Sequence, residues 1–200
     1  MSSTPTLSSL MSAGPTAHVD GALAPSPWIV RFAHLVPRGA RVLDLACGSG
    51  RHARYFAARG CVVSAVDRDA EALGTLAGIP GIETRQADLE TDDWPLAGSV
   101  FDAIVATNYL HRSRLSDLVA MIADDGTLLY ETFARGNEAY GRPANPDFLL
   151  ERDELLRVAS PLAVVAFEQG VVTSTARRAV VQRLAAVGPR RTWPVSLIGD

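Results

Sequence analysis

The segment that most constrains the fold joins a short apolar run to a helical pattern through a glycine turn. Residues 41–46 (RVLDLA) predict a buried strand, and residues 51–59 (RHARYFAAR) predict a helix that ends at Gly60. Gly48 and Gly50 lie between them and permit turn conformations that are barred to other residues. A strand, a glycine turn and a helix in direct succession favour ligand binding, because the helix N-terminus presents free N–H groups.

Strands and helices continue to alternate along the chain after this segment. Further strands are expected at 61–66, 82–87, 101–107 and 127–133, helices at 68–77 and 112–123, and a lead-in helix at 28–36. The helix at 112–123 is expected to close at Asp125-Gly126. This alternation requires right-handed crossovers and predicts a parallel sheet that is covered on both faces.

The last part of the chain breaks this alternation. A long loop at 134–146 contains two glycines and two prolines, and a short helix is expected at 152–159. Two strand-like runs, 163–168 and 179–184, follow, and their short connection makes them antiparallel if they pair. The expected fold is therefore α/β: a Rossmann-like, doubly wound, seven-stranded and mostly parallel sheet that ends in an antiparallel β-hairpin.

Composition limits the function classes that remain open. The chain has 200 residues and a net charge of −3, which argues against a nucleic-acid partner bound through a broad basic face. All 19 basic residues are arginine, which excludes Schiff-base chemistry and a phosphate-loop lysine. Cys47 and Cys61 show no zinc spacing, so we expect no metal site.

Sequence features also suggest the organisation and location of the chain. Residues 1–24 are rich in Ser, Thr, Pro, Gly and Ala and predict a flexible arm, whereas 25–200 are expected to form a single domain. No signal-peptide pattern is visible, and no apolar run reaches the roughly 20 residues that span a bilayer. We expect a bacterial cytoplasmic protein without a membrane partner, and the oligomeric state stays open.

The glycine turn alone fits two classes of cofactor. Residues 48–53 (GSGRHA) match the dinucleotide pattern G-x-G-x-x-G/A, which would indicate an NAD-binding oxidoreductase. Asp44, however, stands at the strand end just before the turn, where a carboxylate would repel a pyrophosphate. It suits a ligand that carries ammonium and sulfonium charges. The expected hairpin also leaves no room for a separate substrate domain. A cofactor with ammonium and sulfonium charges is therefore favoured over NAD.

Residues 43–60 (LDLACGSGRHARYFAARG) resemble the first motif of class I S-adenosylmethionine-dependent methyltransferases, in the form seen in the tellurite-resistance group. The resemblance covers roughly residues 41–187 and continues through 66–68 (VDR), 87–89 (ADL) and 101–105 (FDAIV). The chain departs from the family at Ala46, where glycine is usual. The resemblance implies S-adenosylmethionine as cofactor.

The resemblance also implies a role for each matching position. Asp44 would hold the methionine amino group, Asp67 would accept from the ribose hydroxyls, and Asp88 would accept from the adenine amino group. The other cofactor-binding positions that it implies are Ala46, Cys47, Gly48, Gly50, Arg68, Leu89, Asn108 and Tyr109. Structural alternatives exist for two of them: Asp67 could be only a helix cap, and Asp88 a loop residue. His52, on the first turn of the expected helix, could touch the cofactor or lie at the surface.

Residues after the fourth and fifth expected strands are candidates for the acceptor side, because ligands bind at the carboxyl ends of strands in open α/β sheets. The catalytic candidates are Tyr109, His111 and Glu131, and His111 is the most natural general base. In the long loop, Arg135, Tyr140 and Arg142 are candidates for binding the substrate, and the two arginines could meet an anionic one.

We therefore expect a methyltransferase that acts on a small-molecule acceptor. Two alternatives stay open: a non-catalytic S-adenosylmethionine-binding regulator or partner subunit, and a methyltransferase for protein or RNA. Residues 107–110 (TNYL) lack the NPPY-type motif of enzymes that methylate adenine in nucleic acid. Methyl transfer from a sulfonium needs mainly position and a dry pocket, so the sequence does not identify the acceptor.

Overall fold

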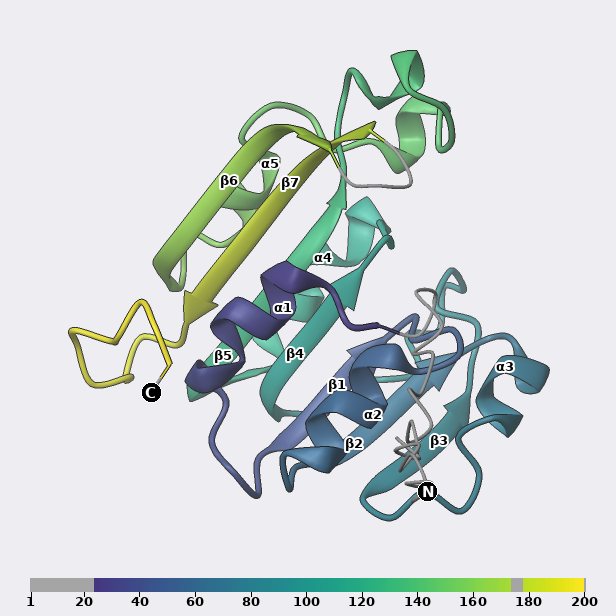
Figure 1. Ribbon diagram of the computed structural model, residues 1–200, viewed down its shortest axis with the longest axis vertical. Coiled ribbons are helices and arrows are strands. Elements are labelled where there is room, and N and C mark those ends of the chain that lie inside the picture. Colours follow the sequence, from purple (N-terminus) through teal and green to yellow (C-terminus); the bar gives the residue numbers. More distant parts are fainter. Residues whose placement is uncertain (1–23, 174–177, 200) are drawn as a thin grey trace, which may run out of the picture.

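A computed structural model describes residues 24–173 and 178–199 of the chain. The expected arm at 1–24 lies outside the described residues except for its last one. Figure 1 shows one twisted sheet with helices on both of its faces. In sheet order, the strands are β3 (Ile82–Gln86), β2 (Val62–Asp67), β1 (Arg41–Leu45), β4 (Phe101–Thr107), β5 (Ile122–Phe133), β7 (Arg178–Val187) and β6 (Ala163–Thr173).

The direction of the strands confirms the expected fold class. β3, β2, β1, β4 and β5 pair in parallel, whereas β5 pairs with β7, and β7 with β6, in antiparallel fashion. The chain builds β1, β2 and β3 outward in one direction and then returns to place β4 on the other side of β1. The carboxyl ends of β1 and β4 therefore flank the topological switch point, where open α/β sheets bind ligands.

Two hydrophobic cores fix the helices on the two faces of the sheet. On one face lie α1 (Pro27–Phe32), the short 3-10 turn η1 (Ala33–Leu35), α2 (Arg51–Ala58) and α3 (Ala70–Gly74). On the other lie α4 (Leu115–Ala120) and α5 (Glu154–Val158). Alternate strand residues face opposite cores: Val42 packs with the first group, and Leu43 with the second.

Several element boundaries differ from the sequence expectation. The helix expected at 112–123 is a 3-10 turn, η2 (Arg112–Arg114), followed by α4, and the Asp125-Gly126 pair lies inside β5 instead of closing the helix. The reason is an irregularity in pairing, because β5 skips several residues between its partners of Phe101 and Ala103. A Cβ on Gly126 would lie 3.0 Å from the backbone oxygen of Asp102, so the strands approach closely there.

The remaining differences concern the length of elements. α3 starts later than expected, at Ala70, because the Asp69 side chain accepts from the N–H groups of Glu71 and Ala72; it ends at Gly74. β6 and β7 are longer than the runs at 163–168 and 179–184, since pairing continues as far as Thr173 and Arg178. The long loop contains two 3-10 turns, η3 (Asn137–Ala139) and η4 (Pro146–Phe148).

No helix within the described ranges is both long and apolar enough to cross a membrane. Among these same residues, no cluster of His, Cys, Asp and Glu could hold a metal ion. The extent of the single domain and the cytoplasmic location stay predictions.

Candidate functional site

The turn after β1 has a backbone that only a few residue types adopt readily. Gly48 and Gly50 have φ values of 53° and 75°, and Ala46 has a φ of 52°. Such values are uncommon for a residue with a side chain, so Ala46 occupies a strained position that suits glycine. The N–H of Cys47 donates to Val66 O at 3.0 Å and holds this strained segment against the end of β2.

Asp67, the last residue of β2, is bonded to the glycine turn. Its Oδ2 accepts from the N–H of Gly48 at 2.7 Å, and its Oδ1 accepts from the N–H of Asp69 at 2.9 Å. It is therefore not the cap of α3, because that role belongs to Asp69. Each carboxylate oxygen has two lone pairs, so both oxygens of Asp67 can still accept from a ligand.

A pocket of about 200 Å³ opens beside this turn at the switch point. Residues that follow four parallel strands line it: Ala46 after β1, Asp67 and Arg68 around the end of β2, Ala87, Asp88, Leu89 and Glu90 after β3, and Tyr109 after β4. Six of the residues that the sequence predicted are thus brought together. Ala87 and Glu90 were not predicted as site residues, although Ala87 belongs to the 87–89 motif; the signal for Glu90 was its closeness to Asp88.

Asp44 lies beneath the turn and is almost sealed from solvent, with 1% of its surface exposed. Its Oδ2 accepts from the N–H of Ala53 at 2.8 Å. Burial raises the pKa of Asp44 to about 7, although the Ala53 N–H and the charge of Arg51 oppose that change; Asp67 adds to it. A carboxylate that is so poorly solvated favours a cationic partner.

His52 is buried rather than on the surface. Its Nε2 accepts from the backbone N–H of Ser26 at 3.1 Å, and its Nδ1 lies 4.0 Å from Oδ1 of Asp44. Burial and the charge of Arg51 lower the pKa of His52 to about 3, so the ring is neutral at physiological pH. No local pattern in the sequence indicates this burial, because Ser26 belongs to a segment that precedes the sheet.

Of the predicted residues after β4, Tyr109 lines this pocket, and His111 lies beside it. The Tyr109 hydroxyl donates to Leu89 O at 3.4 Å, and burial together with Glu90 and Asp88 raises the pKa of Tyr109 to about 12. His111 Nδ1 lies 3.0 Å from the same carbonyl oxygen and must donate to it. Asn108 is exposed, with a φ of 57°. His111 lines a smaller neighbouring pocket with Tyr109 and not the pocket of Asp67.

Glu131, near the end of β5, contacts Ser26, which lies just before α1, and Arg183 of β7. The Ser26 hydroxyl is 3.2 Å from both of its carboxylate oxygens, and Arg183 of β7 lies 2.7 Å from Oε2. Its side chain is 12% exposed. Glu131 is therefore placed between the segment before α1 and the hairpin, outside the pocket of Asp67.

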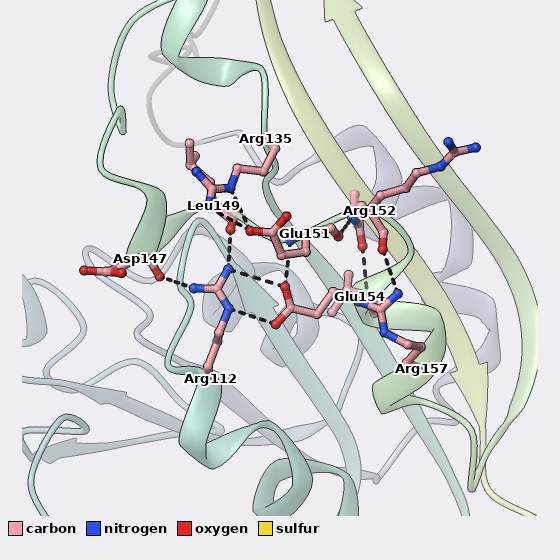
Figure 2. A network of polar contacts seen from close by, with 10 residues as sticks. Arg112, Arg135, Asp147, Leu149, Glu151, Arg152, Glu154 and Arg157 are labelled. Carbon is pink, nitrogen blue, oxygen red and sulfur yellow. Dashed lines mark hydrogen bonds and ion pairs between the residues drawn. The ribbon is translucent and has the colours of Figure 1, made fainter.

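The three residues of the long loop lie apart from this pocket. Arg135 forms an ion pair with Glu151 at 2.8 Å, and the Tyr140 ring lies 5.0 Å from the Arg178 guanidinium. Arg142 precedes a cis proline. Figure 2 shows the Arg135–Glu151 pair within a larger polar network, so the charge of Arg135 is already balanced by the protein.

At the centre of that network, Arg112 joins the turn after β4 to the segment before α5 (Figure 2). It donates to Glu154 Oε1 at 2.9 Å, to Asp147 O at 2.9 Å and to Leu149 O. The Glu154 side chain in turn accepts from the N–H of Glu151 at 2.7 Å. These contacts fix the segment that follows the long loop against the carboxyl end of β4.

The chain is similar to known proteins in sequence and in fold. Residues 42–128 match the family model described as a methyltransferase domain. No curated protein sequence matches the chain. Solved structures with the same fold include TehB from Haemophilus influenzae, which is 20% identical with a TM-score of 0.65. That match covers 80% of this chain but only 61% of the TehB chain, less than two thirds of its length.

Two further structures have a similar fold. A TehB-like SAM-dependent methyltransferase from Corynebacterium glutamicum is 19% identical, with a TM-score of 0.58, and the match covers 80% of this chain and 85% of that one. The 1,6-didemethyltoxoflavin-N1-methyltransferase of Burkholderia thailandensis is 21% identical, with a TM-score of 0.60 and coverages of 80% and 75%. The latter structure contains 1,6-didemethyltoxoflavin and S-adenosylhomocysteine.

Residues 42–128 match a methyltransferase-domain model, and the sheet has the fold of these methyltransferase structures. Among them, the TehB proteins are similar to this chain in fold. The predictions of the family resemblance and of the fold are therefore confirmed, whereas the methyltransferase activity and the cofactor, S-adenosylmethionine, stay predictions. The roles of the individual site residues stay predictions.

Proposed function

We propose that the protein transfers a methyl group from S-adenosylmethionine to a small-molecule acceptor. The observation that carries this proposal is the pocket at the switch point, where Asp67, Asp88 and Leu89 line one wall beside the glycine turn. It lies within the matched methyltransferase segment, which ends at residue 128.

The residues present fit the cofactor. Asp67 keeps free lone pairs for ribose hydroxyls, and Asp88 uses Oδ1 to accept from the N–H of Glu90 at 2.9 Å, which leaves Oδ2 for an adenine amino group. A Cβ placed on Gly48 would meet no atom within 4 Å, so this part of the turn faces open space. Asp44 beneath the turn supplies the negative charge that an ammonium group requires.

When bound, the cofactor supplies an activated methyl group on a sulfonium whose leaving group is neutral. The protein then needs chiefly to orient the acceptor and to exclude water. Tyr109 stays protonated at neutral pH, because its pKa lies at about 12, so it can donate a hydrogen bond but is a poor base. His111 already donates through Nδ1 to Leu89 O. We therefore assign positioning roles to both residues.

The acceptor is proposed to be small for two reasons. The net charge of −3 disfavours a broad nucleic-acid interface, and the Burkholderia thailandensis structure of this fold contains the small molecule 1,6-didemethyltoxoflavin. Tyr140 and Arg142 remain candidates for acceptor recognition, whereas Arg135 would first have to leave Glu151.

Calorimetry tests the cofactor part of the proposal. S-adenosylmethionine and S-adenosylhomocysteine should bind to the wild-type protein, and NAD should not. Asp67→Ala should weaken binding, whereas Asp124→Ala should not, because Asp124 is an exposed partner of Arg190 at the opposite end of β5. Binding of NAD alone would overturn the proposal.

A screen with methyl-labelled cofactor tests the acceptor part. Label should pass to a compound in a small-molecule extract. Transfer to protein or RNA instead would favour the macromolecular alternative, and tight cofactor binding without transfer to any fraction would favour a non-catalytic binding protein.

A further inference from the structure

A buried junction at Ser26 connects the segment before α1 with the acid beneath the glycine turn. The Ser26 N–H donates to His52 Nε2 at 3.1 Å, and its hydroxyl contacts Glu131. The Ser26 hydroxyl oxygen also accepts from the N–H of Trp28 as the cap of α1. Ser26 is only 3% exposed, and His52 and Asp44 are each 1% exposed.

The bond from Ser26 fixes the proton of His52 on one nitrogen. A backbone N–H can only donate, so Nε2 must accept and cannot carry the proton. The buried ring is neutral, so its single proton is on Nδ1, which lies 4.0 Å from Asp44 Oδ1. This distance is too long for a hydrogen bond. Both groups are buried, however, and in a buried environment a nearby N–H dipole still favours the ionised form of a carboxylate.

We propose that His52 is a positioning residue for the proposed cofactor site: held by the Ser26 N–H, it directs its Nδ1–H at Asp44 and keeps that carboxylate ready for the ammonium group of the ligand. The inference rests on the proposed function, because it assigns the ammonium group to Asp44. In this proposal His52 touches no ligand and acts through its neighbour Asp44.

The other groups around Asp44 do not replace this contact. Ala53 N–H binds the other carboxylate oxygen, Oδ2. Arg51 attracts the charge from the start of α2, where its Nη2 lies 3.4 Å from Thr107 Oγ1. Asp67 on β2 repels it, and the neighbouring Cys47 thiol stays neutral because burial raises its pKa. His52 is thus the side chain whose N–H faces Oδ1.

Two substitutions test the contacts of the two His52 ring nitrogens separately. In His52→Asn, the amide can place an N–H near the position of Nδ1 but does not reach Ser26. In His52→Gln, the longer amide can accept from Ser26 near the position of Nε2 but presents no donor to Asp44. His34→Gln is the matched control, because His34 is a partly exposed histidine of η1 that contacts Ser196 O and not Asp44.

The first measurement needs no ligand. A ¹³C NMR titration of the Asp44 carboxyl should show a higher midpoint in His52→Gln than in wild type, because a donor that favours the ionised form is gone. The midpoint in His52→Asn and His34→Gln should stay near that of wild type. Equal midpoints in both His52 variants would overturn the proposal, whatever their thermal stability.

The second measurement is the affinity for S-adenosylmethionine at several pH values. At pH 7.5, His52→Gln should bind about three- to tenfold more weakly than wild type, less than the loss of a full hydrogen bond to a charge, because the contact is 4.0 Å long. Its affinity should recover as the pH rises, whereas His52→Asn should bind nearly as wild type does. Equal losses in the two variants would overturn the inference but leave the proposed function intact. A wild-type protein that does not bind this cofactor would refute the proposed function instead.

Discussion

Replacing Asp44 with asparagine should make the ligand-free protein more stable at neutral and alkaline pH. Burial raises the pKa of Asp44 from 3.8 to about 7, so the folded chain retains a proton that the unfolded chain releases above about pH 4. The stability that this proton confers is fully present below pH 3.8 and is lost as the pH rises through 7.

The size of the effect follows from the same shift. At about 1.4 kcal/mol for each pH unit, the loss reaches about 4 kcal/mol at pH 7 and above. Asparagine can still accept from the Ala53 N–H and has no charge to bury. Its amide would face the Nδ1–H of His52, donor against donor, so about 4 kcal/mol is the upper limit of the gain.

Urea unfolding of both proteins between pH 4 and pH 8.5 would measure this difference. The free energies of unfolding should coincide near pH 4 and diverge up to about pH 8, and the variant should no longer bind S-adenosylmethionine tightly. Parallel curves for the two proteins would refute the reasoning.

Asp102→Asn provides a control of opposite sign. Burial alone would raise the pKa of Asp102, but hydrogen bonds and the charge from Arg41 outweigh burial and lower it. Asp102 therefore contributes stability above pH 3.8 that is lost as the pH falls through its lowered pKa. Its replacement should destabilise the protein at pH 7 and have little effect in strong acid.

Three further predictions concern other contacts. Asp67→Ala should cost about 1–3 kcal/mol of cofactor affinity in calorimetry, because ribose hydroxyls lose a charged acceptor; an unchanged affinity would remove Asp67 from the site. Gly50→Ala should lower the midpoint of thermal unfolding, since φ is 75° and the new Cβ would lie 2.5 Å from Leu76 side-chain atoms. Gly78→Ala, at a φ of 74° with no atom within 4 Å of the new Cβ, isolates the backbone part of that effect. Arg112→Lys should increase amide hydrogen exchange at residues 147–151, because a lysine cannot reach Glu154 and the carbonyls of Asp147 and Leu149 at once. Unchanged exchange there would show that Arg112 does not hold this segment.

The pocket was predictable because its residues follow the ends of parallel strands. Asp67 and Asp88 are far from Ala46 in sequence, but a parallel sheet brings the carboxyl ends of β1, β2 and β3 to one edge. The apolar runs and glycines that define those strands are local signals. The final hairpin was predictable for the same reason, because two apolar runs with a short connection can pair only in antiparallel fashion.

The rest depends on contacts that leave no local pattern. The burial of His52 needs Ser26, which approaches from a segment 26 residues earlier. The pairing of Arg135 with Glu151 needs the chain to return along β5, where Ala134 and Leu150 form a bridge. The placement of Asp125-Gly126 inside β5 reflects the pairing irregularity with β4, which overrides the turn preference of that dipeptide.

The bond from Gly48 to Asp67 has a consequence for the thermodynamics of binding. A turn with three left-handed residues would sample many conformations if nothing held it, and ordering it would cost about 1–2 kcal/mol of backbone entropy for each residue. The Asp67 carboxylate holds the turn in shape before any ligand arrives. That entropy is therefore lost when the chain folds and not when the cofactor binds. A substitution at Asp67 would change both the ligand contact and the order of the free turn, so calorimetry should show an unfavourable entropy term in addition to the lost enthalpy.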